Sequence, residues 1–517
     1  MVQTFWRRTG LIAFANAAAL GLQFLTTILI AREFGASAQM DAYTLAVSIP
    51  EALQYVLMLA TLSFVFTPLF IDERLQQGEN EAWSIAFTLL LLVCGFVLLL
   101  IPLLFLAMPA LMFALAPGFA PDTRALAVEL GDLILPGLFY YATAGLLLGI
   151  CFAYDDFTTA ALNTLLVAVL NLAAFFFLVQ FLQWGVRGLM LGRLFALGAL
   201  EIFLLVRALR FKPPCVEKIR WRNRHAWRVL TYLPPYMFGA LAWQVQLLIS
   251  RSLLSTLGAG SVAAWGYGQR LSDIPMAVLG GAIGTTFLPS FAKHVSDRDN
   301  RQASASWNHA LVRVSLLLAP LAGFLTALAV PLITVLLQRG AFDERSTQAT
   351  ALVLMGLALG LPARGIGGLI TRGLPAFPSR VLPILLSGIA MALTIAFLFA
   401  LIGALGLLGV ALATSIGEVF YAVAGTFIFA RWLHSNFLFT LRVLAKIFVA
   451  AVIIFFIGVA VVSLVSNPLL QLVIAGALSF CAYAVFAYAL NLPETRAVQQ
   501  IVSNASEKCS TMLKGLK

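Results

Sequence analysis

Residues 82–121 read AWSIAFTLLLLVCGFVLLLIPLLFLAMPALMFALAPGFAP and contain no Asp, Glu, Lys or Arg. A helix needs about 20 apolar residues to cross the hydrocarbon core of a bilayer. The stretch is therefore long enough for one spanning helix and the loop that leaves it. No alternating strand pattern is visible, and lipid offers no partners to backbone groups, so helices are the expected spanning structure.

The rest of the chain has the same apolar character. Its 517 residues are 61% hydrophobic and only 11% charged, whereas soluble domains carry about 45–50% apolar and about 25% charged residues. Too few polar side chains remain to cover a soluble core of this size. The composition predicts an integral membrane protein. It excludes a soluble nucleic-acid-binding domain, a disordered chain and a secreted disulfide scaffold.

Turn residues divide the longest apolar runs into single spans. Gly403 and Gly406 mark a turn inside one run, and Ser466-Asn467-Pro468 marks a turn inside another. We predict an all-α polytopic membrane protein with about fourteen transmembrane helices. The predicted spans are 9–32, 41–70, 83–113, 124–153, 157–183, 187–210, 227–255, 261–292, 306–338, 346–373, 380–402, 407–432, 441–465 and 468–490.

The basic residues between the spans predict the orientation. Segment 207–228 joins the sixth and seventh spans and is the richest in Lys and Arg. Loops of this kind stay on the cytoplasmic side. Both termini are therefore expected in the cytoplasm, and the protein in the bacterial cytoplasmic (inner) membrane. The net charge of +11 is attributed to these loops, and no nucleic-acid partner is expected.

Two pairs of prolines indicate an internal repeat. Ile49-Pro50 matches Ile274-Pro275 at an offset of 225, and Pro136 matches Pro362 at an offset of 226. The repeat predicts two parallel six-helix lobes with a substrate path at their interface. The predicted organisation is an N-lobe at 1–210, a basic linker at 211–226, a C-lobe at 227–432, an added helix pair at 433–490 and a cytoplasmic tail at 491–517.

A few polar side chains fall at membrane depth, where charges are costly and by default functional. Arg270 and Asp273 are three residues apart on one helix face, with Tyr267 beside them. Glu51 and Gln54 form a similar face after Pro50. An arginine in a central cavity suits a diphosphate headgroup, because guanidinium matches its oxygens. The alternative is a purely structural pair of Arg270 with Asp273.

The remaining intramembrane charges have less specific patterns. Asp41 either caps its own helix or forms an outer gate contact. We expect Arg251, Arg364 and Arg372 to lie near helix ends or to snorkel. Candidates for a proton or cation site are the carboxylates Glu129, Asp132, Glu201 and Glu418.

No motif of an enzyme or metal site is present. The chain has no GxxxxGK[ST], HExxH or GxSxG sequence, and its five cysteines and four histidines are scattered. We expect neither catalysis nor a metal nor a cofactor. Transport would then use an ion gradient, the membrane potential or a downhill substrate gradient, and the identity of a coupling ion stays open.

Three blocks of sequence carry a resemblance to a known family. They are residues 31–43 with Ile49-Pro50, residues 260–290, which include YGQRL at 267–271 and LGGAIGT at 279–285, and LQRGAF at 337–342. With the count of fourteen spans, the chain resembles the MurJ/MviN family. This family comprises the lipid II flippases of the multidrug/oligosaccharidyl-lipid/polysaccharide exporter (MOP) superfamily.

The resemblance implies a fold and a mechanism. Two six-helix lobes would surround a cationic cavity, and the last two helices would form a groove for a polyprenyl tail. Alternating access would carry the lipid-linked glycan from the inner to the outer leaflet. Arg270 falls on the family's cavity arginine, and Arg32 and Asp41 fall on its basic and acidic positions at the first outer loop.

The sequence departs from the family pattern in one respect. Residues 9–31 contain no Lys or Arg, and Gln54 stands where well-studied members have an arginine. The alternatives are therefore a flippase for another polysaccharide lipid intermediate and a cation-coupled exporter of the same superfamily. A scaffold acting through 207–228 and an integral glycosyltransferase are further readings. The expected partners are a polyprenyl-diphosphate glycolipid, membrane lipids and cell-wall synthesis proteins.

Overall fold

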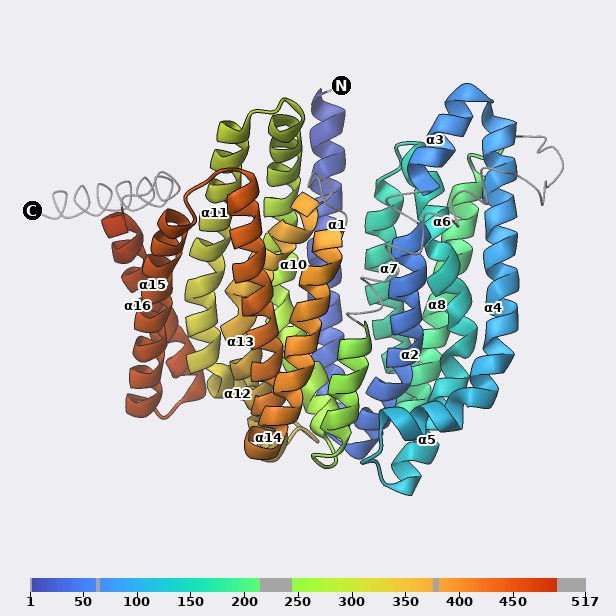
Figure 1. Cartoon of the computed structure of the whole chain (residues 1–517). Coiled ribbons are helices and arrows are strands. Elements are labelled where there is room, and N and C mark those ends of the chain that lie inside the picture. The colour runs from blue at the N-terminus through green and yellow to red at the C-terminus, as the bar shows by residue number, and fades with distance from the viewer. Residues whose placement is uncertain (1, 62–65, 214–243, 375–380, 491–517) are drawn as a thin grey trace, which may run out of the picture. The chain divides into compact units, whose positions relative to one another are not determined.

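The computed structural model describes residues 2–61, 66–213, 244–374 and 381–490, and these are helices joined by turns, with no strand among them (Figure 1). The predicted all-α membrane fold is confirmed. Within the described residues, ten helical stretches are long and apolar enough to cross a bilayer. This number is lower than the fourteen predicted spans, because some predicted spans form one continuous helix and others lie partly outside the described residues. The predicted span at 227–255 lies outside the described residues as far as 243, and the predicted tail at 491–517 lies outside them entirely.

Helix α14 (Val381–Trp432) shows how two predicted spans merge. At 1.5 Å per residue its 52 residues would extend about 78 Å, far beyond the ~30 Å core of a bilayer. The chain reverses at Gly406, whose φ of +54° lies in the left-handed region that glycine adopts without a Cβ clash. Gly417 of the second arm packs against Thr394 of the first. The two arms correspond to the spans predicted at 380–402 and 407–432.

The chain forms two compact units. One comprises Met1–Ala263 with Arg339–Phe342, and the other comprises Ala264–Gln338 with Asp343–Lys517. The boundary falls inside a helix rather than in the predicted linker at 211–226. Most of that linker lies outside the described residues.

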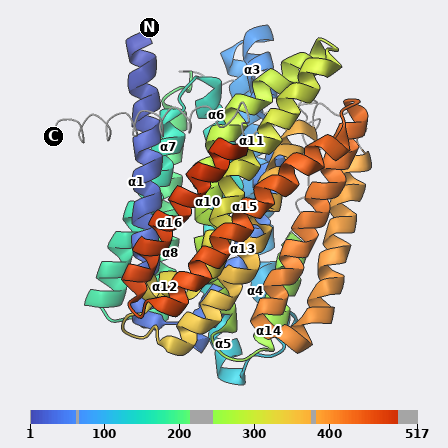
Figure 2. The ribbon, with the colours of Figure 1, turned by 90° about the vertical axis from the view of Figure 1, so that its left-hand side faces the viewer.

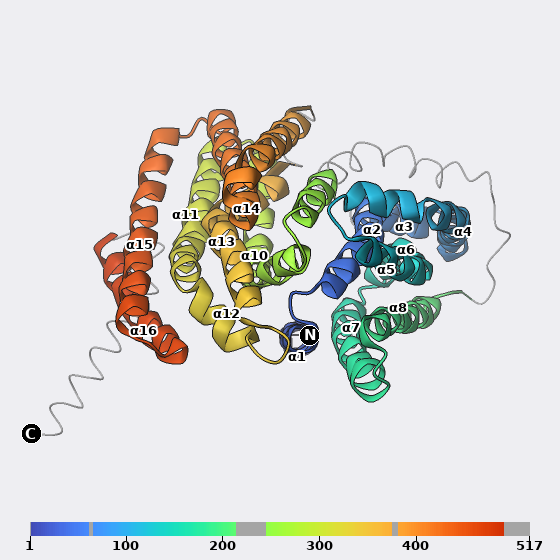
Figure 3. The same cartoon turned by 90° about the horizontal axis from the view of Figure 1, so that it is seen from below.

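In the first unit, α2, α5, α6 and α8 pack together (Figure 3). Pro136 lies in a short 3-10 turn, Leu135–Gly137, because it cannot donate to the helical ladder, and this turn separates α5 from α6. The helices are α1 (Val2–Phe34), α2 (Ala38–Thr61), α3 (Thr67–Gln76), α4 (Glu79–Leu115), α5 (Pro121–Ile134), α6 (Leu138–Ala153), α7 (Thr158–Ala174) with the π-helical Phe175–Phe181, and α8 (Gly185–Leu209).

The second unit is built around buried aromatic rings. Trp307 stacks on Phe429 at 4.3 Å between ring centroids, and Phe291 packs against both. The helices are α10 (Ser261–Ser296), whose first three residues belong to the first unit, α11 (Asn300–Ala327), α12 (Ala329–Leu337), α13 (Glu344–Gly373), α14, α15 (Phe437–Leu464) and α16 (Pro468–Leu490).

The last two helices are attached to this unit through small residues. Gly323 of α11 packs against the backbone of Ala451 in α15, and Gly458 of α15 packs against Ala327. The hydroxyl of Tyr483 on α16 donates to the carbonyl oxygen of Leu316 at 2.8 Å. Figure 2 shows α15 and α16 side by side. The pair therefore packs on α11 and α12 as a defined element.

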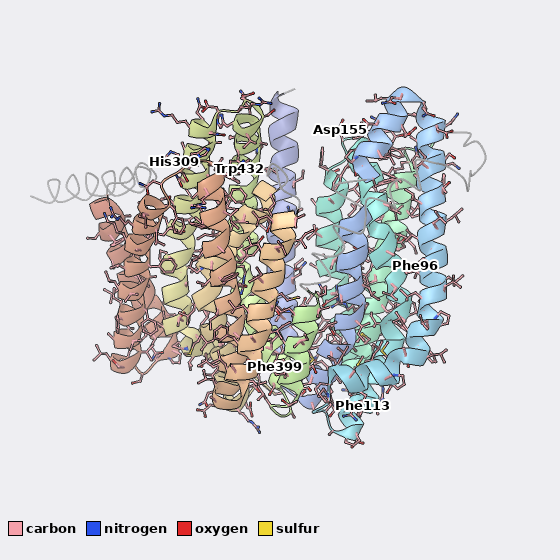
Figure 4. All side chains as sticks on the ribbon, in the orientation of Figure 1. Phe96, Phe113, Asp155, His309, Phe399 and Trp432 are labelled. Carbon is pink, nitrogen blue, oxygen red and sulfur yellow. The ribbon has the colours of Figure 1, made fainter. Side chains whose placement is uncertain are left out.

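Large apolar side chains cover the outside of both units. On α4, Phe96 and Phe113 are more than half exposed, as is Phe399 on α14 (Figure 4). Exposed apolar surface on this scale is typical of lipid contact. Inside the helix bundles, by contrast, a few charged side chains are present.

Candidate functional site

A charged junction joins three helices of the second unit. Arg364 of α13 donates from Nε to Oε1 of Glu418 on α14 at 2.8 Å, and from Nη1 to Oδ1 of Asp273 on α10 at 2.9 Å. The same Nη1 lies 3.3 Å from the hydroxyl of Ser272. The side chains of Arg364 and Glu418 are 19% and 9% exposed. One guanidinium therefore serves two carboxylates in a largely buried position.

This junction corrects one prediction. Arg364 was expected to lie near a helix end or to snorkel, but it lies inside α13 and is paired on both sides. The carboxylate of Asp273, which was considered as a partner of Arg270, accepts from Arg364. Spacing along α10 could not predict this contact, because the guanidinium comes from another helix.

Small residues make this close packing feasible. A Cβ at Gly360 would lie 2.5 Å from Oε2 of Glu418 and from the hydroxyl oxygen of Ser415. Ser415 in turn donates to the carbonyl oxygen of Gly356 at 2.7 Å. The absence of side chains at the two glycines lets α13 and α14 approach until Glu418 is enclosed. Oε2 of Glu418 is buried and has no hydrogen-bond partner among the described residues.

Arg270 lies one helical turn before Asp273 on α10. Its side chain is exposed, whereas Tyr267, three residues earlier, is 3% exposed. Asp273 is about half exposed. The three predicted residues of this helix therefore stay close together, with Tyr267 in the packed interior and Arg270 at the surface of the unit.

The first unit contains a second charged junction. Arg193 of α8 donates from Nη2 to Oε1 of Glu51 on α2 at 2.8 Å and to the hydroxyl of Tyr141 on α6 at 3.1 Å. Glu51 is therefore the counter-ion of an arginine. Gln54, one turn further along α2, is partly exposed. Sequence reasoning missed Arg193, although a lone arginine in the predicted span at 187–210 is itself the signal for a functional or paired charge.

Asp41 caps a helix other than its own. Its Oδ2 accepts from the backbone N–H of Gly260 at 2.6 Å and its Oδ1 from that of Ala263 at 2.7 Å, at the first turn of α10. The side chain is 1% exposed. Of the two alternatives for Asp41, the cap of α2 is wrong, since Ser37 occupies that place and accepts from the N–H of Met40, while the outer gate contact stays a prediction.

The end of α1 binds a loop from far along the chain. The carbonyl oxygen of Arg32 accepts from the N–H of Ala341 at 2.8 Å, and Gly35 packs against the carbonyl of Ala341. Gly35 has φ of +60° and cannot accept a Cβ at this contact. The side chain of Arg32 is exposed. Residues 339–342 of the block at 337–342 therefore contact the end of α1 within the first unit.

The remaining predicted carboxylates have different surroundings. Glu129 of α5 forms a two-point ion pair with Arg187 of α8, and both are substantially exposed. Glu201 of α8 contacts the hydroxyl of Thr143 on α6. Among the described residues, no three His, Cys, Asp or Glu side chains are grouped to hold a metal ion.

Solved structures with a similar fold define the class of protein. An inward-closed lipid II flippase MurJ superposes with a TM-score of 0.77 at 21% identity, covering 93% of this chain and 99% of that one. An inward-facing MATE family transporter of the MOP superfamily gives 0.69 at 16% identity, covering 81% and 94%. The fold is that of multi-pass helical membrane transporters.

Sequence similarity specifies the family. The profile described as lipid II flippase MurJ matches residues 30–492. The chain belongs to this family, and it is a multi-pass inner-membrane protein. Because the family consists of transporters, the prediction that the chain is not an enzyme is confirmed.

Curated relatives carry the same description. The lipid II flippase MurJ of Burkholderia cenocepacia is 29% identical over 341 residues, which cover 64% of this chain and 66% of the relative. A probable lipid II flippase MurJ of Rhizobium tropici is 26% identical over 423 residues, covering 77% and 76%. That of Rickettsia prowazekii is 24% identical over 421 residues, covering 80% and 81%.

Proposed function

We propose that this protein is a flippase that moves lipid II, a polyprenyl-diphosphate-linked glycan, from the inner to the outer leaflet by alternating access. The observation that carries the proposal is the exposed side chain of Arg270. It lies on α10 about 14 Å from the start of that helix. An arginine at membrane depth is costly unless it meets water, an anion or a counter-ion. A diphosphate supplies oxygens that match the guanidinium in pairs.

The charged junction of α10 supports this role for Arg270. Asp273 is the nearest carboxylate along the helix, and Arg364 already holds it at 2.9 Å. In the proposed site, Arg270 binds the diphosphate, and Tyr267 and Asp273 fix the local shape of α10.

Residues of the first unit complete the proposal. Glu51 and Gln54 on α2 would face the glycan headgroup, with Arg193 holding Glu51 in place. Asp41 and Arg32 would form the outer gate, since both lie where the ends of helices are tied to distant segments. Separation of these contacts would open the site outward.

The domain arrangement belongs to the same proposal. The N-lobe at 1–210 and the C-lobe at 227–432 would rock against each other about the linker at 211–226, with both termini in the cytoplasm. The pair α15–α16 would hold the polyprenyl tail. Exposed Phe456 and Phe480 supply the apolar surface that such a tail requires. Cell-wall synthesis proteins are the proposed partners.

Replacement of the flippase in a strain depleted of it tests this proposal. Expression of the wild-type chain should restore growth and the appearance of lipid II in the outer leaflet. Arg270→Ala should abolish both, although the protein is still made. Arg187→Ala is the matched control, because this arginine is exposed and its ion pair in the described part of the chain is with the exposed Glu129. Normal growth with Arg270→Ala would instead favour a cation-coupled exporter. Loss of growth caused by Glu418→Gln alone would favour the same alternative.

A further inference from the structure

Glu201 of α8 lies in an environment that supplies a hydroxyl group as its partner. Its Oε1 lies 2.7 Å from the hydroxyl oxygen of Thr143 on α6. That hydroxyl oxygen also lies 2.7 Å from the carbonyl oxygen of Phe139. Three oxygen atoms thus form a chain of two short contacts, and both contacts have the length of O–H···O hydrogen bonds.

Counting protons along this chain identifies the state of the carboxyl group. A threonine hydroxyl has one proton, and a carbonyl oxygen has none to give. If the hydroxyl donates to Phe139, the contact with Glu201 lacks a proton unless the carboxyl group carries one. If the hydroxyl donates to Glu201 instead, two acceptors face each other at Phe139. A protonated Glu201 that donates to Thr143 satisfies both contacts.

Among the described residues, no basic side chain forms an ion pair with Glu201. Its Oε2 is buried and accepts no hydrogen bond from the described residues. Arg193 lies two turns earlier on the same helix, about 12 Å away, and is engaged by Glu51 and Tyr141. Glu418 also has one oxygen without a partner, but Arg364 donates to its other oxygen. An ionised carboxylate is costly to bury without such a partner, and protonation removes that cost.

Among the described residues, the titratable groups that interact with Glu201 carry no positive charge. Cys94 of α4 and Tyr140 of α6 are its electrostatic neighbours. Tyr140 accepts from the side-chain amide of Asn163 on α7 at 3.0 Å. On α5, Glu129 is paired with Arg187, and Arg124 at the start of that helix donates to the carbonyl oxygen of Phe119. On α2, Glu51 is paired with Arg193.

We propose that Glu201 is a proton-binding site and that the proton is the cation coupled to transport. With its proton bound, Glu201 donates to Thr143 and holds α6 against α8. Release of the proton leaves a negative charge on Glu201 that must be hydrated. We therefore expect α6 and α8 to separate around Glu201. The assignment of the proton to the carboxyl group stands on the contacts alone, whereas its coupling to lipid transport rests on the proposed function.

Infrared spectroscopy of the full-length purified protein tests the site without any substrate. The wild-type spectrum at neutral pH should contain the C=O stretch of a protonated carboxyl group, which decreases as pH rises. The variant Glu201→Gln should lack that component, and Glu129→Gln should retain it. Identical carboxyl bands in wild type and Glu201→Gln would overturn the assignment.

Transport in proteoliposomes tests the coupling. An imposed pH gradient should change the rate at which the wild type and Glu129→Gln translocate lipid II. The rate of Glu201→Gln, whose amide can still donate to Thr143, should not respond to the gradient. A response equal to that of the wild type would overturn the coupling. If the wild type moves no lipid II, the proposed function fails, while the infrared result still decides the proton site.

Discussion

Arg193 of α8 and Glu418 of α14 are 225 residues apart, which is also the separation of Pro50 and Pro275. Each is a charged residue of the sixth helix in its predicted six-helix repeat. Arg193 joins the second and fourth helices of the first repeat through Glu51 and Tyr141, and Glu418 joins the fourth helix of the second repeat through Arg364. Asp273, on the second helix of that repeat, completes its junction. In each unit a partly buried ion pair thus helps to join the corresponding three helices, and the charge on the sixth helix is positive in the first unit and negative in the second.

Removal of Arg364 should strongly destabilise the second unit. Arg364→Leu leaves two carboxylates without their shared partner, and loss of one member of a buried pair costs about 3–5 kcal/mol. We expect a clear fall in the thermal unfolding midpoint of the purified protein. Arg364→Lys should recover only part of it, because an ammonium group cannot reproduce the fork that reaches both helices.

The exposed Arg187 provides the control for this experiment. Arg187→Leu breaks an ion pair of the same type with Glu129, and such exposed pairs contribute little. Its unfolding midpoint should stay close to that of the wild type. Equal losses from both variants would contradict the structural importance of the buried junction.

A charge exchange tests the junction of the first unit. Glu51→Arg or Arg193→Glu alone places like charges at a contact now 2.8 Å long, and each should reduce the amount of folded protein. The double variant restores opposite charges and should recover a measurable part of the loss. The coupling is the deviation from additivity of the unfolding free energies. Strict additivity would mean that the pair does not stabilise the fold.

Asp41 should hold the first turn of α10 through its two accepted backbone bonds. Asp41→Ala removes both acceptors, and loss of a helix cap costs about 0.5–2 kcal/mol. Hydrogen exchange should accelerate at the amides of Gly260 and Ala263. Ser37→Ala, which affects the cap of α2, should leave those two amides protected. Unchanged exchange in Asp41→Ala would show that another group caps α10.

Acid should weaken the turn between α6 and α7. Burial raises the pKa of Asp156, but hydrogen bonds from Thr158 and Thr159 and the charge of Arg207 outweigh it, so the pKa is lower than the usual value. A lowered pKa stabilises the fold above the unfolded value of about 3.9, and this contribution is lost as pH falls through the folded value. Asp156→Asn should therefore be less stable than the wild type at neutral pH. The difference in unfolding midpoint should narrow below about pH 3.9, and a constant difference would contradict the assignment.

The sequence predicts the helices well because hydrophobicity and length alone determine a membrane span. The predicted spans at 83–113 and 468–490 correspond closely to α4 and α16, and the turn predicted at Gly406 is present. Charge pairing was predicted less well. Asp273 pairs with Arg364 across 91 positions, and Asp41 caps a helix 219 positions away. Such contacts depend on which helix faces meet, and spacing along one helix carries no information about that.

Translocation of lipid II by the purified protein tests the central claim most directly. The wild type and Arg270→Ala would be reconstituted in liposomes that contain labelled lipid II, and the fraction exposed on the opposite leaflet would be followed over time. The account predicts movement by the wild type and by Arg187→Ala, and none above protein-free liposomes by Arg270→Ala. Movement by Arg270→Ala at the wild-type rate would contradict it.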